Sequence, residues 1–306
     1  MKKLLKNIVY FIFPVVAVLV ATEYLAENIP NEYSIKNDYL EKNSDTVEAL
    51  YLGNSHVYFG INPEYSTHKS YNAAYISQSI NLDWMIVGKY NWKDLKYIII
   101  PADYVSMYYT LETANDKWRI KNYNVYYHFR IGYNPINYTE IFTGKIKDQV
   151  KRIDEFYIAN QKNIQSNDLG FGTAYRYPSP LDIAKTSKEA AKLHTFDIRS
   201  DKYQNNFKIN KAALYDLAAF AKKKNIKVVF LSSPVCKKYF DGCDKTQLSN
   251  TMKVYSDLLA KYPETCSHLN YMESSYFNES DFYDGDHLNN RGAQKLTVLV
   301  ESQLGK

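Results

Sequence analysis

Apolar runs of strand length alternate with helix-like segments along most of the chain. Buried parallel strands are predicted at residues 47–52, 71–75, 97–101, 227–232 and 269–272. Over residues 209–221 apolar side chains recur at helical spacing, lysines follow where the C-terminal end of the helix dipole favours cations, and VVFL continues as a strand. Because parallel strands need crossovers, this alternation predicts an α/β fold, a flavodoxin-like three-layer sandwich with about five parallel strands.

The first 26 residues have the pattern of a membrane anchor. Three lysines within the first six residues precede an apolar run over residues 8–21, and acidic residues follow from Glu23. The run approaches the roughly 20 residues that a spanning helix needs, although its uninterrupted part is short enough for a signal peptide. No clear small-x-small cleavage site precedes Glu23, which favours an uncleaved anchor. The lysines then stay in the cytoplasm, and the chain beyond about residue 29 lies in the periplasm or at the cell surface.

The remaining chain divides into a linker and one large domain. Residues 27–46 are polar and rich in asparagine, which suits a tether between membrane and domain. The domain covers residues 47–306. Around residues 104–207 the strand rhythm is lost and tyrosines cluster, so this part is predicted to be an insertion over the strand ends, with one long helix near residues 146–164.

Composition narrows the classes of function. The 306 residues are 45% hydrophobic, and the net charge of +5 comes partly from the N-terminal lysines, leaving no basic stripe for a nucleic-acid backbone. Nucleic acid is therefore not an expected partner. The thirty tyrosines suit stacking on sugar rings, but the accompanying Lys, Asn and Ile are also what an AT-rich genome encodes, and this second interpretation is favoured.

The three cysteines, Cys236, Cys243 and Cys266, lack CxxC spacing, so neither a structural zinc nor a thioredoxin-like motif is expected. Cys236 and Cys243 could close a short loop in an oxidising compartment. Free buried thiols are slightly preferred. No cofactor is expected.

Two polar motifs carry the candidate chemistry. LGNSH ends the first predicted strand, and its glycine permits a tight turn that would place Ser55 near a helix N-terminus, where backbone N–H groups favour a developing negative charge. Alone, a serine at such a place is more often a helix cap than a nucleophile.

The second motif, YDGDHLNNRGAQKL, precedes the predicted terminal helix. Its Asp284 and His287 are three residues apart, so that the carboxylate can accept the Nδ1 proton while Nε2 takes a proton from serine. Alone, the motif would be taken for a solvated acidic loop. A metal site using Asp284, Asp286 and His287 is given low weight because no second ligand cluster is visible, and no metal is expected.

Together the motifs resemble the first and fifth sequence blocks of the SGNH/GDSL hydrolase superfamily, and the resemblance extends to DGDHLNNRGAQ and to the strand and helix order across most of residues 47–306. It implies that Ser55 is the nucleophile and that Asp284 and His287 complete the triad.

The middle blocks match less well. YNAAYISQS resembles the second block, with Ser77 where the family has a glycine whose N–H enters the oxyanion hole, and Asn72 is a further candidate for oxyanion or substrate contact. PADY stands in for the third block and puts Asp103 where a side-chain amide donor is expected. An ionised aspartate would repel an oxyanion, so Asp103 has another role, a third donor comes from elsewhere, or two backbone N–H groups suffice. His56 is positioned for contact with a substrate rather than as a base.

Within the superfamily, the anchor and the degenerate third block look most like alginate O-acetyltransferases and the D-alanyl transfer proteins of teichoic acid synthesis. This similarity implies acyl-ester chemistry on a cell-envelope polysaccharide, as an esterase or O-acyltransferase, beside a membrane-bound O-acyltransferase that delivers the acyl group. The alternative is an inactive SGNH-like protein that binds a glycan or scaffolds a synthase. The altered third block favours this alternative, and the intact Ser55, Asp284 and His287 oppose it.

Overall fold

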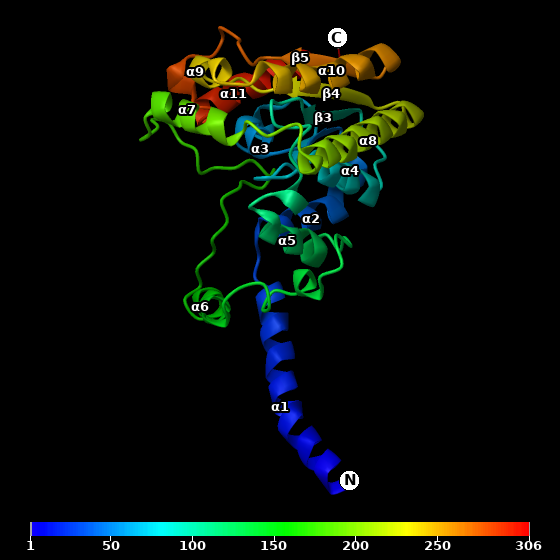
Figure 1. Ribbon diagram of the computed structural model, residues 1–306, viewed down its shortest axis with the longest axis vertical. Coiled ribbons are helices and arrows are strands. Elements are labelled where there is room, and N and C mark those ends of the chain that lie inside the picture. The colour runs from blue at the N-terminus through cyan, green and yellow to red at the C-terminus, as the bar shows by residue number, and fades with distance from the viewer. Residues whose placement is uncertain (1, 306) are drawn as a thin grey trace. The chain divides into compact units, whose positions relative to one another are not determined.

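The computed structural model describes residues 2–305 and contains a five-stranded, wholly parallel sheet (Figure 1). The strands are β1 (Ala49–Tyr51), β2 (Ser70–Asn72), β3 (Tyr97–Pro101), β4 (Lys227–Ser232) and β5 (Cys266–Asn270). Their order is β2-β1-β3-β4-β5, the flavodoxin-like order in which the chain reverses direction beside the first strand. The predicted α/β class and all five strand positions are confirmed, with shifts of a few residues at β1, β2 and β5.

Helices cover both faces of the sheet. On one face Tyr51, Ile99 and Leu231 share an apolar cluster with side chains of α3 (Ser55–Gly60) and α11 (Asn290–Glu301). On the other face, the Phe230 ring of β4 lies 5.0 Å from the Tyr255 ring of α10 (Lys245–Lys261). Helices α4 (Ile80–Lys89) and α8 (Asp201–Lys224) pack against each other, and α8 also packs on β4. Alternate residues of each strand thus face opposite helical layers.

The described residues form further helices. They are α1 (Lys2–Glu27), α2 (Glu32–Asn43), α5 (Ile120–Tyr126), α6 (Ile146–Tyr157), α7 (Ile183–Leu193) and α9 (Lys237–Asp241). Short 3-10 helices occur at Ser44–Thr46, Pro63–Tyr65, Leu111–Thr113, Lys117–Arg119, Pro135–Tyr138 and Glu279–Asp281.

The chain forms two compact units. One contains the sheet and consists of Tyr39–Ala114 and the chain from Gln165 onward, and the other consists of the residues up to Asp38 and Asn115–Ile164. The predicted insertion around 104–207 is therefore not one body. Its middle part belongs with the N-terminal segment and its flanks belong with the sheet. Its long helix, α6, ends at Tyr157 rather than near residue 164.

The linker predicted at residues 27–46 is mostly helical, because α2 covers Glu32–Asn43. The Asn31 side chain accepts the backbone N–H groups of Tyr33 and Ser34 at 3.0 and 3.1 Å and so caps α2. Tyr39, near the end of α2, stacks on Tyr71 of β2 at 3.8 Å between ring centroids.

Among residues 2–305, one helix is long and apolar enough to cross a membrane. It covers Lys6–Glu27, 22 residues with a mean hydropathy of 2.1, and no residue of its most apolar stretch is buried in the protein. The three cysteines are free and buried, as the preferred interpretation expected.

Candidate active site

A tight turn after β1 presents Ser55. Gly53 has φ +116°, which disfavours L side chains, and a Cβ there would lie 2.4 Å from the Pro101 ring. Asn54 caps α3 by accepting the His56 N–H at 3.0 Å, and Ser55 is the first residue of that helix. Ser55 is therefore fixed at the C-terminal edge of β1, as the first motif predicted.

The two predicted motifs meet at this edge. His287 Nε2 lies 2.7 Å from Ser55 Oγ, although the residues are 232 positions apart. The Asp284 carboxylate lies 3.0 and 3.1 Å from His287 Nδ1 through its two oxygens. Asp284 Oδ1 also accepts the backbone N–H groups of Asp286 and His287, at 3.1 and 2.8 Å, which holds the carboxylate in position. These distances are the ones that a serine nucleophile, a histidine base and an orienting carboxylate would require.

A second carboxylate lies beside the first. The Asp286 side chain is buried, and its Oδ1 lies 3.4 Å from His287 Nδ1. Burial acts to lower the pKa of His287, but Asp286 and Asp284 outweigh it and raise that pKa well above the ordinary value. The basic form of the imidazole therefore becomes more abundant as the pH rises.

Asp286 is compensated by a cation on its other side. His56 is buried, with Nε2 3.0 Å from Asp286 Oδ2 and Nδ1 2.8 Å from Asp103 Oδ2. Burial acts to lower the pKa of His56, and the two carboxylates raise it to about 9, so this ring is an imidazolium at neutral pH. The substrate contact expected for His56 does not fit this position, because both ring nitrogens are used inside the protein.

The hydrogen-bond partners of Asp103 explain why a carboxylate stands where a side-chain amide was expected. Its Oδ1 accepts the N–H of Ser233 after β4 at 3.2 Å, and its Oδ2 accepts from Asn54 at 3.3 Å as well as from His56. The buried carboxylate thus joins the ends of β1, β3 and β4. It does not serve as the oxyanion donor that its sequence position suggested, since a carboxylate only accepts.

Asn72 lies in the core rather than at a surface for substrate. Its amide donates to the carbonyl groups of Val57 and Ile61 at 2.9 and 2.7 Å, and its oxygen accepts from the Ala74 N–H. The side chain is fully buried, so we do not carry Asn72 into the proposed substrate site.

The segment that contains Ser77 is bonded to the nucleophile turn. Tyr75 N–H donates to the Gly53 carbonyl at 3.0 Å, and Ser77, half-buried, has φ 62°. Among the described residues, the backbone N–H of Ser55 has no hydrogen-bond partner, so it is available to an oxyanion. Ser77 stays a candidate for the second donor.

Several side chains beside the triad lie outside the two sequence motifs. Tyr175 stacks on Phe59 and on Tyr283, with centroids 3.8 and 4.0 Å apart, and its ring lies 5.5 Å from that of His287. His194 lies 3.5 Å from Asp286, and burial lowers its pKa to about 4, so it is neutral. Tyr175 belongs to one of the tyrosine clusters, which was a weak signal, whereas His194 is preceded by an ordinary amphipathic helix.

His56, Asp286 and His287 are the one set of described residues whose ligand atoms lie close enough to hold a metal ion, within 4.8 Å of one another. In the structure these atoms already form ion pairs with one another, and His287 Nε2 faces Ser55. This set overlaps only partly with the metal ligands considered from the sequence, because Asp284 is replaced by His56.

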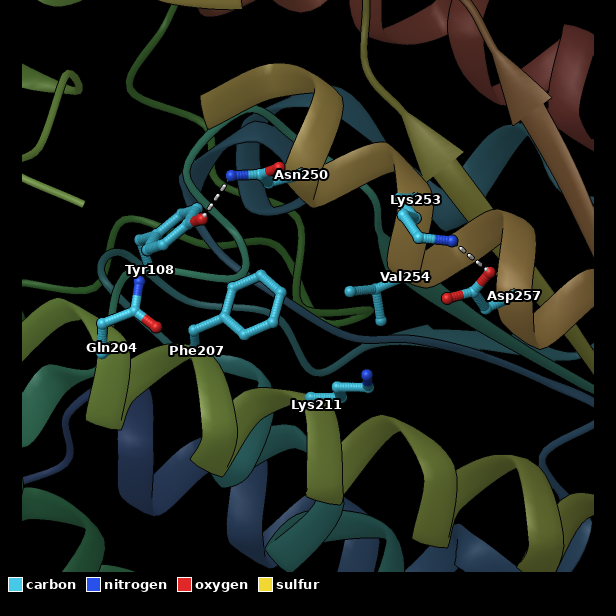
Figure 2. Close-up of a pocket in the computed structure, with 8 residues that line it drawn as sticks. All are labelled: Tyr108, Gln204, Phe207, Lys211, Asn250, Lys253, Val254 and Asp257. Carbon is cyan, nitrogen blue, oxygen red and sulfur yellow. Dashed lines mark hydrogen bonds and ion pairs between the residues drawn. The ribbon is translucent and has the colours of Figure 1, made fainter. Parts of the chain in front are cut away.

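Two surface cavities lie elsewhere in the sheet-containing unit. Figure 2 shows one of about 250 Å³ between α8 and α10, where Asn250 donates to the Tyr108 hydroxyl and Lys253 pairs with Asp257. The other, about 570 Å³, is lined by residues of α7 and α9 and their ends. Neither is lined by a triad residue.

Comparison with known proteins gives only distant likenesses. Neither a family model nor a curated protein matches the sequence. A Streptococcus pneumoniae structure provisionally described as a platelet activating factor is 11% identical, over 96% of this chain and 97% of that one, with a TM-score of 0.43. A Bacteroides fragilis structure provisionally described as an acylhydrolase is 10% identical, over 88% and 93%, with a TM-score of 0.37. At these values neither likeness assigns a function to this chain.

Proposed function

We propose that the protein carries out serine-dependent acyl-ester chemistry, as an esterase or an O-acyltransferase of the SGNH/GDSL type. The observation that carries the proposal is the 2.7 Å approach of His287 Nε2 to Ser55 Oγ, with Asp284 on the opposite ring nitrogen. A solvated acidic loop and a helix cap have no reason to meet in this way.

In the proposed reaction Ser55 Oγ attacks the carbonyl carbon of an ester while His287 Nε2 takes the serine proton. Asp284 keeps the Nδ1 proton in place and stabilises the imidazolium. The N–H groups of Ser55 and Ser77 stabilise the oxyanion, and His287 returns the proton to the leaving alcohol. The acyl-serine then passes its acyl group to water in an esterase or to a sugar hydroxyl in a transferase.

We place this chemistry at the outer face of the cytoplasmic membrane. The lysines at the N-terminal end of α1 favour a cytoplasmic N-terminus, so α1 acts as a single-pass anchor and the C-terminal domain lies in the periplasm or at the cell surface. A fixed enzyme there meets envelope polymers, and a cell-envelope polysaccharide is the proposed substrate. A membrane-bound O-acyltransferase that supplies the acyl group is the proposed partner of the transferase form.

One observation favours the alternative of an inactive glycan-binding or scaffold protein. Asp103 occupies the place of the expected amide donor and is bonded to His56 instead, so the oxyanion site lacks that donor. Removing one such donor costs roughly 10²–10³ in rate in an acyl-transfer enzyme, which slows but does not abolish catalysis.

Active-site labelling distinguishes the two. The full chain in detergent is treated with a fluorophosphonate, and the labelled residue is identified by mass spectrometry. We expect a single adduct on Ser55, lost in Ser55→Ala and kept in a Ser274→Ala variant, which changes a serine away from the triad. Absence of an adduct on folded protein across pH 6 to pH 10 would support the inactive alternative.

A further inference from the structure

Besides α1 itself, an apolar surface lies near the C-terminal end of α1, in the unit formed by the residues up to Asp38 and Asn115–Ile164. The Glu23 carboxylate of α1 accepts the backbone N–H groups of Glu140 and Ile141 at 2.6 and 2.9 Å. Arg152 of α6 donates to the Ala26 carbonyl at 3.0 Å, and the Tyr157 hydroxyl donates to the Leu25 carbonyl at 3.2 Å. Helix α6 is therefore bonded to the end of α1.

A buried ion cluster makes this attachment rigid. The Glu140 carboxylate is fully buried and is bonded to Lys121 at 2.5 Å, to Arg152 at 2.6 Å and to the Tyr126 hydroxyl at 2.8 Å. Burial acts to raise the pKa of Glu140, but the two cations outweigh it and lower that pKa. The cluster joins α5, α6 and the turn between them, and loss of one partner would leave an uncompensated buried charge.

Helix α6 has three distinct faces. Gln149 and Arg152 point into the unit, where they bond Glu140. Lys151 and Glu155 pair on a polar face at 3.4 Å. A third face follows the helical spacing i, i+4, i+7, i+11 and is apolar, with the residues Ile146, Val150, Ile153 and Tyr157.

Most of the apolar face of α6 is open to solvent, and only Ile153 in its middle is half-buried. Ile146 is 67% exposed, Val150 54% and Tyr157 41%, and the flanking Phe142 and Ile158 are 54% and 77% exposed. A stripe of this length on a short helix is unusual for a surface in water and marks a site of contact with an apolar partner.

We propose that α6 lies in the interfacial layer of the same bilayer that α1 spans, with its apolar face in the boundary between headgroups and acyl chains. The inference rests on the anchoring role proposed for α1. The bonds to Glu23, Leu25 and Ala26 hold α6 where the apolar run of α1 gives way to polar residues, which is the level of the membrane surface. In Figure 1 α6 is seen nearly end-on beside this end of α1, which runs up the picture, so α6 lies crosswise to α1, as an interfacial helix should.

The same geometry gives α6 a function distinct from anchoring. A single spanning helix leaves the chain free to rotate about the helix axis and to tilt. A second contact with the membrane through α6, which is rigidly bonded to α1, fixes both the rotation and the tilt of this unit.

The proposal is tested by lipid quenching of fluorophores on single introduced cysteines. The full chain carries Val150→Cys on the apolar face, Lys151→Cys on the polar face as the matched control, or Val16→Cys in α1. The native thiols are buried, and burial raises the pKa of Cys236 and Cys243 to about 12 and of Cys266 to about 11, so brief labelling at neutral pH selects the introduced thiol. Protein without an introduced cysteine gives the background.

Each variant is reconstituted into phosphatidylcholine and phosphatidylglycerol vesicles with nitroxide groups near the headgroup or deep in the acyl chain. We expect shallow nitroxides to reduce emission from position 150 about twofold, because interfacial helices insert roughly 5–10 Å. Position 151 should lose little, and position 16 should respond to the deep nitroxides.

An unquenched position 150 beside a quenched position 16 would overturn the α6 proposal and leave the anchor intact. It would direct attention to a second copy of the chain or another protein as the partner of this face. An unquenched position 16 would overturn the anchor, and the α6 proposal with it.

Discussion

His56 Nδ1 lies 2.8 Å from the Asp103 carboxylate, and this buried pair stands directly behind the proposed nucleophile. Through His56 Nε2 the pair reaches Asp286, which in turn lies beside His287. Buried charges persist when each is paired, and here the His56 imidazolium lies between the carboxylates of Asp103 and Asp286. Asp103, which stands where the SGNH pattern has an amide donor, is thus part of an electrostatic network. Its presence means more than the loss of that donor.

The Gly53→Ala substitution should be severely destabilising or should displace Ser55. A methyl group at that position meets Pro101 at 2.4 Å, and φ +116° is strained for alanine, so a loss of about 3 kcal/mol or more is expected. Gly88→Ala in α4 is the matched control, since nothing lies within 4 Å of its added Cβ and alanine stabilises a helix by roughly 0.5–1 kcal/mol. Urea unfolding of both variants checks the expectation, and equal stability would contradict the structure of the turn.

Asp83 should make the protein less stable as the pH rises from about 4 to 7. Burial raises the pKa of this carboxyl to about 7, against bonds from Gln78 and the Gly53 N–H, while the unfolded pKa stays near its ordinary value of 3.8. The unfolded state therefore releases the proton first, and the stability present below pH 4 declines until the folded pKa is reached.

Asp83→Asn should remove this decline. Between pH 5 and pH 8 the stability difference between variant and native protein should change in favour of the variant by roughly 3 kcal/mol, or less if the buried group is partly hydrated. Urea unfolding at both pH values measures it. A constant difference would mean that the native carboxyl is already ionised at pH 5.

Most of the fold was predictable because the sequence patterns that indicate its strands and helices are local. Strand runs such as that before Gly53 are continuous and apolar, and the ends of parallel strands share one edge, so the meeting of Ser55 with His287 followed from their positions at strand and helix ends. Helix α2 also had a local signal, the Asn31 cap followed by Glu32, but the surrounding asparagines favoured the interpretation as a polar tether.

The rest depends on side-chain directions that no periodicity specifies. On the loop before α11, Asp284 and Asp286 are equally acidic in sequence, and only the folded loop shows that one orients His287 while the other pairs with His56. The hydrogen bonds between Glu23 and the turn at Glu140 join segments that are 117 positions apart in the sequence. Neither segment contains a pattern that predicts contact with the other.

A reporter fusion tests the topology of α1. With the lysines at the N-terminal end of α1 in the cytoplasm, alkaline phosphatase joined after Lys306 should be active and a reporter that needs the cytoplasm should be silent. Activity ratios in intact cells measure the result. Replacing Lys2, Lys3 and Lys6 with glutamine should reduce the bias, and a phosphatase that is silent in the native fusion would reverse the proposed orientation.

The pH dependence of Ser55 reactivity should report the network behind it. The groups that face His287 are Asp284, Asp286 and Ser55, with the charged His56 beyond Asp286, neutral His194 nearby, and the rings of Phe59 and Tyr175. Because the carboxylates raise the pKa of His287, the rate of fluorophosphonate labelling should rise with pH along a limb centred above the ordinary histidine value. Below that pH the imidazolium cannot accept the serine proton.

Two substitutions should move this limb in opposite directions. Asp286→Asn removes a negative charge beside His287, so the pKa of His287 should fall and the limb should move about one pH unit or more toward acid. His56→Gln removes the cation that compensates Asp286, so the limb should move toward alkali. Asp241→Asn, an exposed carboxylate paired with Lys237 on α9, removes the same charge from the protein and should leave the limb in place. Equal shifts in Asp286→Asn and Asp241→Asn would indicate a net-charge effect, and an unmoved limb in Asp286→Asn would show that Asp286 does not set the basicity of His287.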